Sequence, residues 1–108
     1  MNTAPRNFAA VNNKQQNMEN DYRILVVDDE EDLCEILKFN LETEGYTVET
    51  AYSAEEALTR DIASFNLLLL DVMMGGMSGF ALSKKLKANP ATANIPIIFL
   101  TARDTEND

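Results

Sequence analysis

The residues best suited to carry chemistry are polar side chains that directly follow short apolar runs. They are Asp28, Asp29, Asp71 and Thr101. If each run is a strand of one parallel sheet, these side chains lie beyond the carboxyl ends of the strands, where sites of open α/β sheets form. The sequence therefore predicts three carboxylates and one hydroxyl at a single edge of the sheet.

Carboxylates gathered in this way repel one another unless one is protonated or a cation binds. A hard divalent cation with oxygen ligands is the natural counter-charge, and Mg²⁺ suits a site with few protein ligands. An aspartate with an ordinary pKa near ~3.9 is ionised at pH 7 and acts as a nucleophile without a general base. The pattern thus favours Mg²⁺-assisted phosphoryl transfer. Spacing alone leaves open which aspartate attacks.

Each of these residues also has a purely structural interpretation. Asp29 can be the N-cap of a following helix, with the acids at 30–32 favourable at its positive end. Asp71 alone can simply end a strand. The five consecutive acids at 28–32 exclude a loop that cradles an anionic phosphate, as in flavodoxins.

The elements that must position these residues alternate along the chain. Short apolar or β-branched runs predict strands at 23–28, 47–51, 67–71 and 97–101. Helical spacing between them places apolar residues on one face of each of three predicted helices: Leu33, Ile36, Leu37 and Leu41; Ala54, Ala57, Leu58 and Ile62; and Phe80, Leu82 and Leu86. Such alternation predicts an α/β fold, a doubly wound parallel sheet with helices on both faces.

Two local signals mark helix ends. Gly45 followed by Tyr46 fits the C-terminal end of the first helix, where a glycine adopts a left-handed conformation. Ser53-Ala54-Glu55-Glu56 is a capping box at the start of the second helix.

Composition excludes several classes of function. The 108 residues contain no His and one Cys, so His-based nucleophile pairs, His-ligated zinc and an internal disulfide are excluded. The formal charge of −9 makes nucleic-acid binding by this segment unfavourable. No apolar run spans a bilayer and no signal peptide is visible, which predicts no membrane association and a cytoplasmic location.

The chain divides into two predicted parts. Residues 1–21 are rich in Asn and Gln, their charges cancel, and they predict a disordered leader. Residues 22–108 carry the whole negative charge and the strand–helix pattern, and they form the predicted domain.

The motifs of this domain resemble the receiver domain of bacterial two-component response regulators (CheY-like). The resemblance is carried by 24–30, 67–74, Ser78-Gly79 and 96–102, with similar intervals between them. It implies a flavodoxin-like sheet of strand order 2-1-3-4-5. Asp71 is then the phosphoacceptor, taking a phosphoryl group from the phosphohistidine of a sensor histidine kinase.

The resemblance also implies the remaining roles. Mg²⁺ is held by Asp28, Asp29, Asp71 and the backbone carbonyl of Met73, and Thr101 hydrogen-bonds the new phosphoryl oxygens. The domain is then a signalling module, not a turnover enzyme, and it switches an output such as transcription through a domain outside this sequence.

Two features depart from the family pattern. Gly75 and Gly76 stand where the family often has a proline, which predicts a more flexible loop. The sequence also stops at Asp108, so the family's fifth strand, with its lysine, and the last helices are missing. An uncovered fourth strand predicts an unstable, domain-swapped or homodimeric chain.

Two other functions remain open. One is an interaction module that works without phosphorylation. The other is a Mg²⁺-dependent phosphohydrolase with an Asp nucleophile, although enzymes of the haloacid dehalogenase type need Asp-x-Asp where this chain has Asp28-Asp29-Glu30.

Overall fold

The computed structural model describes residues 21–100. The predicted leader, except Asp21, and the predicted hydroxyl donor Thr101 lie outside the described residues.

Four parallel strands form the sheet. They are β1 (Arg23–Val27), β2 (Thr47–Ala51), β3 (Leu67–Asp71) and β4 (Ile97–Leu100), in the order β2-β1-β3-β4. The predicted parallel α/β sheet is therefore confirmed, with the order 2-1-3-4 over the described residues. The switch in strand order lies between β1 and β3, where a site is expected.

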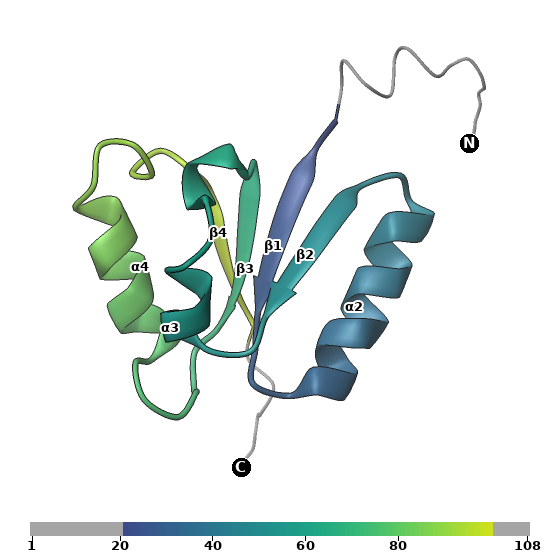
Figure 1. Ribbon diagram of the computed structural model, residues 1–108, viewed down its shortest axis with the longest axis horizontal. Helices are drawn as coiled ribbons and strands as arrows, with labels where there is room; N and C mark the ends of the chain where they lie inside the picture. Colours follow the sequence, from purple (N-terminus) through teal and green to yellow (C-terminus); the bar gives the residue numbers. More distant parts are fainter. Residues whose placement is uncertain (1–20, 101–108) are drawn as a thin grey trace.

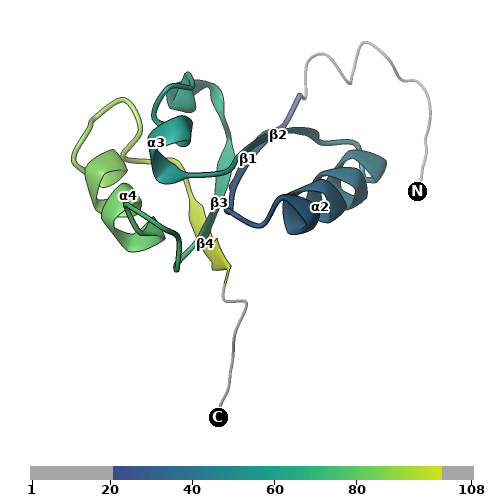
Figure 2. The same ribbon diagram turned by 60° about the horizontal axis from the view of Figure 1, so that its bottom comes forward.

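Helices cover both faces of the sheet (Figure 1). The helix α2 (Glu31–Thr43) lies on one face, and α3 (Ala54–Ala57) and α4 (Gly79–Lys87) lie on the other, as the turned view in Figure 2 also shows. A short 3-10 turn, η1 (Ile62–Ser64), follows α3. This layering confirms the doubly wound arrangement.

The sheet separates two hydrophobic clusters. Because successive side chains of a strand point to opposite faces, Leu25 and Val27 of β1 pack toward α3 and α4, whereas Ile24 and Val26 pack toward α2. All four side chains are almost fully buried. Burial on both faces explains why this strand reads as a continuous apolar run instead of an alternating one.

The predicted helix ends are present. The Gly45 N–H donates to the Glu42 carbonyl and the Tyr46 N–H donates to the Leu41 carbonyl, which is a Schellman end, and Gly45 has φ of 100°. At the start of α3 the Ser53 hydroxyl accepts from the Glu56 N–H. The Glu56 carboxylate accepts from the N–H of Tyr52 rather than that of Ser53.

Two details of the helices differ from the sequence prediction. The helix predicted to reach Ile62 ends at Ala57, because the N–H groups of Thr59 and Arg60 bond three residues back and tighten the chain. Ile36 is 57% exposed, although its spacing placed it on the apolar face. The covered stripe of α2 runs instead along Cys34, Leu37 and Leu41.

Candidate functional site

The first two acids of the site come from the turn that joins β1 to α2. Asp28 follows the last residue of β1, and its N–H donates to the Ala51 carbonyl at 3.1 Å, which extends the pairing with β2. Its Oδ1 accepts from the Glu30 N–H at 2.8 Å, so the side chain also closes the turn. Asp29 is exposed. The N-cap of α2 is Glu30, without a side-chain cap, so the interpretation of Asp29 as an N-cap is wrong.

The third acid is the last residue of β3. Asp71 is 4% exposed, and its backbone pairs with Leu100 of β4. Directly behind it, α4 starts at Gly79, whose N–H donates to the Val72 carbonyl at 3.0 Å. A Cβ at Gly79 would lie 2.1 Å from the Asp71 carbonyl oxygen, so only glycine allows the helix to approach β3 this closely.

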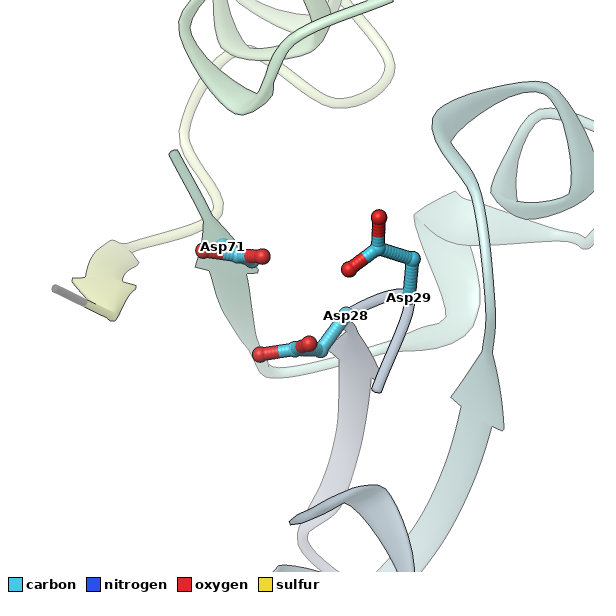
Figure 3. A group of neighbouring side chains, drawn as sticks. All are labelled: Asp28, Asp29 and Asp71. Carbon is cyan, nitrogen blue, oxygen red and sulfur yellow. The ribbon is translucent and has the colours of Figure 1, made fainter. Parts of the chain in front are cut away.

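The carboxyl groups of Asp28, Asp29 and Asp71 converge at the switch point of the sheet. Ligand oxygens of the three side chains lie within 4.8 Å of one another. Figure 3 shows the side chains of Asp28 and Asp29 leaving the end of β1 on the side that faces Asp71 at the end of β3. Residues distant in sequence therefore form one acidic cluster, because parallel strands bring their carboxyl ends to the same edge.

Burial and like charge both act on Asp28. The side chain is 1% exposed, and burial is the largest cause that raises its pKa above the ordinary value. The hydrogen bond from the Glu30 N–H opposes this rise, whereas the neighbouring carboxylates of Asp71, Glu30 and Asp29 add to it. A bound cation would relieve this unfavourable arrangement.

Beneath the cluster lies the one cysteine of the chain. Cys34 is fully buried, and its Sγ–H donates to the Asp28 carbonyl at 3.2 Å. Burial is the main cause that raises its pKa to about 11, and the Asp28 charge adds to it. The thiol stays protonated at neutral pH and serves here as a hydrogen-bond donor to the backbone of the site.

The loop at 72–78 borders the cluster. The Met73 N–H donates to Asp71 Oδ1 at 3.4 Å, and the Gly75 N–H donates to Asp29 Oδ2 at 3.5 Å. Gly76 has φ of 74°, a left-handed conformation that favours glycine. A third carboxylate, that of Glu55 in α3, accepts from the Met77 N–H at 3.2 Å. The two glycines predicted a flexible loop. In the structure, hydrogen bonds to Asp29, in the turn after β1, and to Glu55 of α3 hold this loop.

The donor set fits Mg²⁺. All three side chains supply carboxylate oxygens, which a hard cation prefers, and two of them are buried where uncompensated charge is unfavourable. Few protein ligands leave room for water and a phosphoryl oxygen.

Sequence reasoning missed three contributors to the site. Glu55 gave no signal, because its contact with Met77 spans 22 residues and depends on the tertiary fold. Cys34 also gave none, since a lone cysteine on an apolar stripe is an ordinary core residue. Gly79 entered the sequence analysis only as part of the family resemblance, and its close contact with Asp71 was not predicted. A glycine at the start of a predicted helix was the one signal of that contact.

The fold and this cluster define a parallel α/β domain with an acidic centre at its switch point. Residues 24–108 match the family model of the response regulator receiver domain. The chain belongs to this family, whose members are signalling modules of two-component systems.

Curated relatives agree with this assignment. The chain is 44% identical over 87 residues to the phosphate regulon transcriptional regulatory protein PhoB of Rhizobium meliloti, a match that covers 80% of this chain and 38% of that protein. It is 45% identical over 89 residues to the response regulator PleD of Caulobacter vibrioides, covering 80% of this chain and 19% of PleD. The chain thus spans less than half the length of these relatives.

Solved structures show the same fold. The N-terminal domain of a response regulator receiver protein from Methanoculleus marisnigri superposes with a TM-score of 0.72 at 41% identity, covering 79% of this chain and 70% of that one. The response regulator TrrA of Thermotoga maritima, solved in complex with Mg²⁺-BeF, gives a TM-score of 0.69 at 40% identity, covering 75% of this chain and 70% of that one.

Across the described residues, no helix has the length and apolar character to cross a membrane.

Proposed function

We propose that this domain is a phosphoacceptor that receives a phosphoryl group on Asp71 from the phosphohistidine of a sensor histidine kinase. The observation that carries the proposal is the convergence of the Asp28, Asp29 and Asp71 carboxylates within 4.8 Å at the switch point of the sheet. Membership of the receiver family and the Mg²⁺-BeF complex of a relative support it.

In this proposal Asp28, Asp29, Asp71 and the backbone carbonyl of Met73 hold Mg²⁺. When bound, the ion neutralises the charge that gathers as the phosphoryl group approaches the carboxylates. The ionised carboxylate of Asp71 forms the new O–P bond while the N–P bond of the phosphohistidine breaks. No proton has to leave the nucleophile, which suits a site without His.

A further residue, Thr101, then interacts with the phosphoryl group on Asp71. The phosphoryl group brings about two negative charges and strong hydrogen-bond acceptors. We propose that the Thr101 hydroxyl donates to these oxygens, and that this differential contact shifts the domain between two states. The names of the relatives support an output such as regulation of transcription by the whole protein.

The test is phosphorylation of the purified chain with Mg²⁺ and acetyl phosphate, followed by intact mass. We expect an adduct that hydroxylamine removes, that chelation of Mg²⁺ prevents, and that Asp71→Asn lacks. Asp61→Asn is the matched control, because Asp61 is exposed in the turn before η1. It should accept the phosphoryl group as the unaltered chain does.

Two outcomes would overturn the proposal in different ways. Steady release of phosphate at many turnovers per second would indicate the phosphohydrolase. A folded chain that binds Mg²⁺ but forms no adduct would indicate an interaction module that works without phosphorylation.

A further inference from the structure

The loop at 72–78 has to be held by contacts from outside itself. It joins the proposed phosphoacceptor on β3 to α4, and it carries Met73, whose carbonyl is a proposed Mg²⁺ ligand. Two consecutive glycines, Gly75 and Gly76, give its backbone more freedom than other residues would. The proline that often stiffens this loop in the family is absent.

Contacts from α3 hold this glycine segment. The Met77 N–H donates to Oε2 of Glu55, the second residue of α3, at 3.2 Å. The same carboxylate lies against Gly76: a Cβ there would be 3.1 Å from Oε2 and 3.4 Å from Oε1. The side chains of Met74 and Met77 pack against the hydrophobic cluster that contains Ala54 and Ala57 of α3. One carboxylate from α3 therefore braces the glycine segment.

The position of Glu55 is itself well fixed. Its helix is held at the N-cap by the Ser53 hydroxyl, and the next residue, Glu56, bonds the Tyr52 N–H at 2.8 Å. Ala54 and Ala57 of the same helix are fully buried. The exposed Glu55 carboxylate is therefore presented to the loop from a short but anchored element.

We propose that Glu55 is a positioning residue for the magnesium site: its hydrogen bond to Met77 fixes the loop at 72–78 and thereby the Met73 carbonyl beside the three aspartates. The inference rests on the proposed function, because it concerns the same site. Groups that orient metal ligands typically change metal affinity by about 10–100-fold.

A simpler effect must be separated from positioning, since any acid near the cluster attracts a cation. Two conservative variants divide these effects. Glu55→Gln keeps an acceptor oxygen at the same reach and loses the charge. Glu55→Asp keeps the charge and is one methylene shorter. Glu55→Ala loses both the acceptor oxygen and the charge. Glu44→Ala is the control, because it removes an exposed acid at the C-terminal end of α2, the end far from the aspartates.

Three measurements are made on the chain: Mg²⁺ affinity by calorimetry, hydrogen exchange of the Met77 amide without Mg²⁺, and the Mg²⁺ dependence of phosphorylation by acetyl phosphate. We expect Glu55→Ala and Glu55→Asp to weaken Mg²⁺ binding by about 3–10-fold, less than for a buried partner because Glu55 is exposed. The Met77 amide should exchange faster. The phosphorylation rate at saturating Mg²⁺ should change little. Glu55→Gln and Glu44→Ala should resemble the unaltered chain.

Other results would overturn the inference. If Gln weakens binding as Ala does while Asp does not, only charge matters. If Met77 exchange or Mg²⁺ affinity is unchanged in Glu55→Ala, the brace does not act on the site. If Mg²⁺ binding depends on residue 55 as expected but Asp71 accepts no phosphoryl group, the proposed function fails and the inference about Glu55 stands. If Asp71 is phosphorylated and all variants at residue 55 bind alike, only the inference fails.

Discussion

Two opposing effects act on the Asp28 carboxylate: burial beside other acids disfavours its charge, and a hydrogen bond from the Glu30 N–H favours it. Its carboxylate is almost fully buried beside two others, yet its Oδ1 is needed to accept the Glu30 N–H. Its pKa is raised, so the folded state binds its proton more tightly than the unfolded state. The penalty of holding it ionised is therefore complete above the folded-state pKa, and it disappears as the pH falls toward the ordinary value of 3.8.

Asp28→Asn removes this charge and keeps the oxygen that accepts from Glu30. At pH 7 without divalent ions we expect a melting temperature several degrees higher, since about 1 kcal/mol shifts it by about 4–8 °C in a domain of this size. The unaltered chain should gain stability when Mg²⁺ is added, whereas the variant should not. Calorimetric melts with and without Mg²⁺ measure both effects. A variant that is less stable than the unaltered chain in the absence of metal would contradict this account.

Gly79 decides how closely α4 approaches β3, the strand that ends in Asp71. In Gly79→Ala the new Cβ would lie 2.1 Å from the backbone oxygen of Asp71, so the helix or the strand must shift. We expect a loss of about 1–3 kcal/mol in the free energy of unfolding, as in other overpacked sites, and slower phosphorylation of Asp71.

Gly75→Ala is the matched control, because a Cβ there has nothing within 4 Å and Gly75 is not among the glycines of positive φ. Its stability should stay within about 0.5 kcal/mol of the unaltered chain in urea unfolding. Equal effects of the two substitutions would show that close packing behind Asp71 is not the cause.

At the scale of elements, the capping of α3 matters most, because this four-residue helix presents Glu55 to the loop. The Glu56 carboxylate accepts from the Tyr52 N–H and from Arg60, and these contacts, the backbone one first, hold its pKa below the ordinary value of 4.5. A lowered folded-state pKa means that the ionised form stabilises the fold. This contribution is complete above pH 4.5 and is lost as the pH falls through the folded-state value.

Glu56→Gln should therefore lower the free energy of unfolding at pH 7 and make no difference in strong acid. We expect about 0.5–1 kcal/mol at pH 7, a modest value because the side chain remains partly exposed. Urea unfolding of both proteins between pH 3 and 7 gives the difference directly. A difference for Glu56→Gln that stays constant across this pH range would exclude ionisation as its cause.

The elements also show how far a pattern in the sequence predicts structure. The strands and the Schellman end at Gly45 follow from local signals, and the structure has them. The second helix ends five residues before Ile62, because hydrogen bonds to Glu56 and Ala57 close tighter turns after α3. Helical spacing indicates that α2 has an apolar stripe, but it does not specify which part of that stripe packs on the sheet. Ile36 lies outside the packed part and is exposed.

At the scale of the whole molecule, β4 forms one edge of the sheet that residues 21–100 build. Among residues 21–100, β4 pairs with β3 on one side, and Ile98 in its middle is 53% exposed. Edge strands of this kind invite pairing with another chain.

We expect the chain to self-associate through this edge, and Ile98→Lys to shift it toward the monomer in light scattering coupled to size exclusion. Phe39→Lys is the control, because Phe39 is even more exposed, at 70%, but lies on α2 away from β4. If Phe39→Lys has the same effect, general hydrophobic adhesion explains the association. A strictly monomeric unaltered chain would contradict the expectation.

Local hydrophobic spacing was enough to predict the alternation of strands and helices, the parallel sheet, and the place of Asp28 and Asp71 at the carboxyl ends of two strands. Because a parallel sheet brings those ends to one edge, the approach of Asp71 to Asp28 and Asp29 was also predictable. The hydrogen bond from Met77 to Glu55, the close contact behind Asp71 at Gly79 and the hydrogen bond of the Cys34 thiol to Asp28 depend on the tertiary fold. Each of these contacts joins two elements, and a local pattern in the sequence does not specify how far apart two elements lie in space.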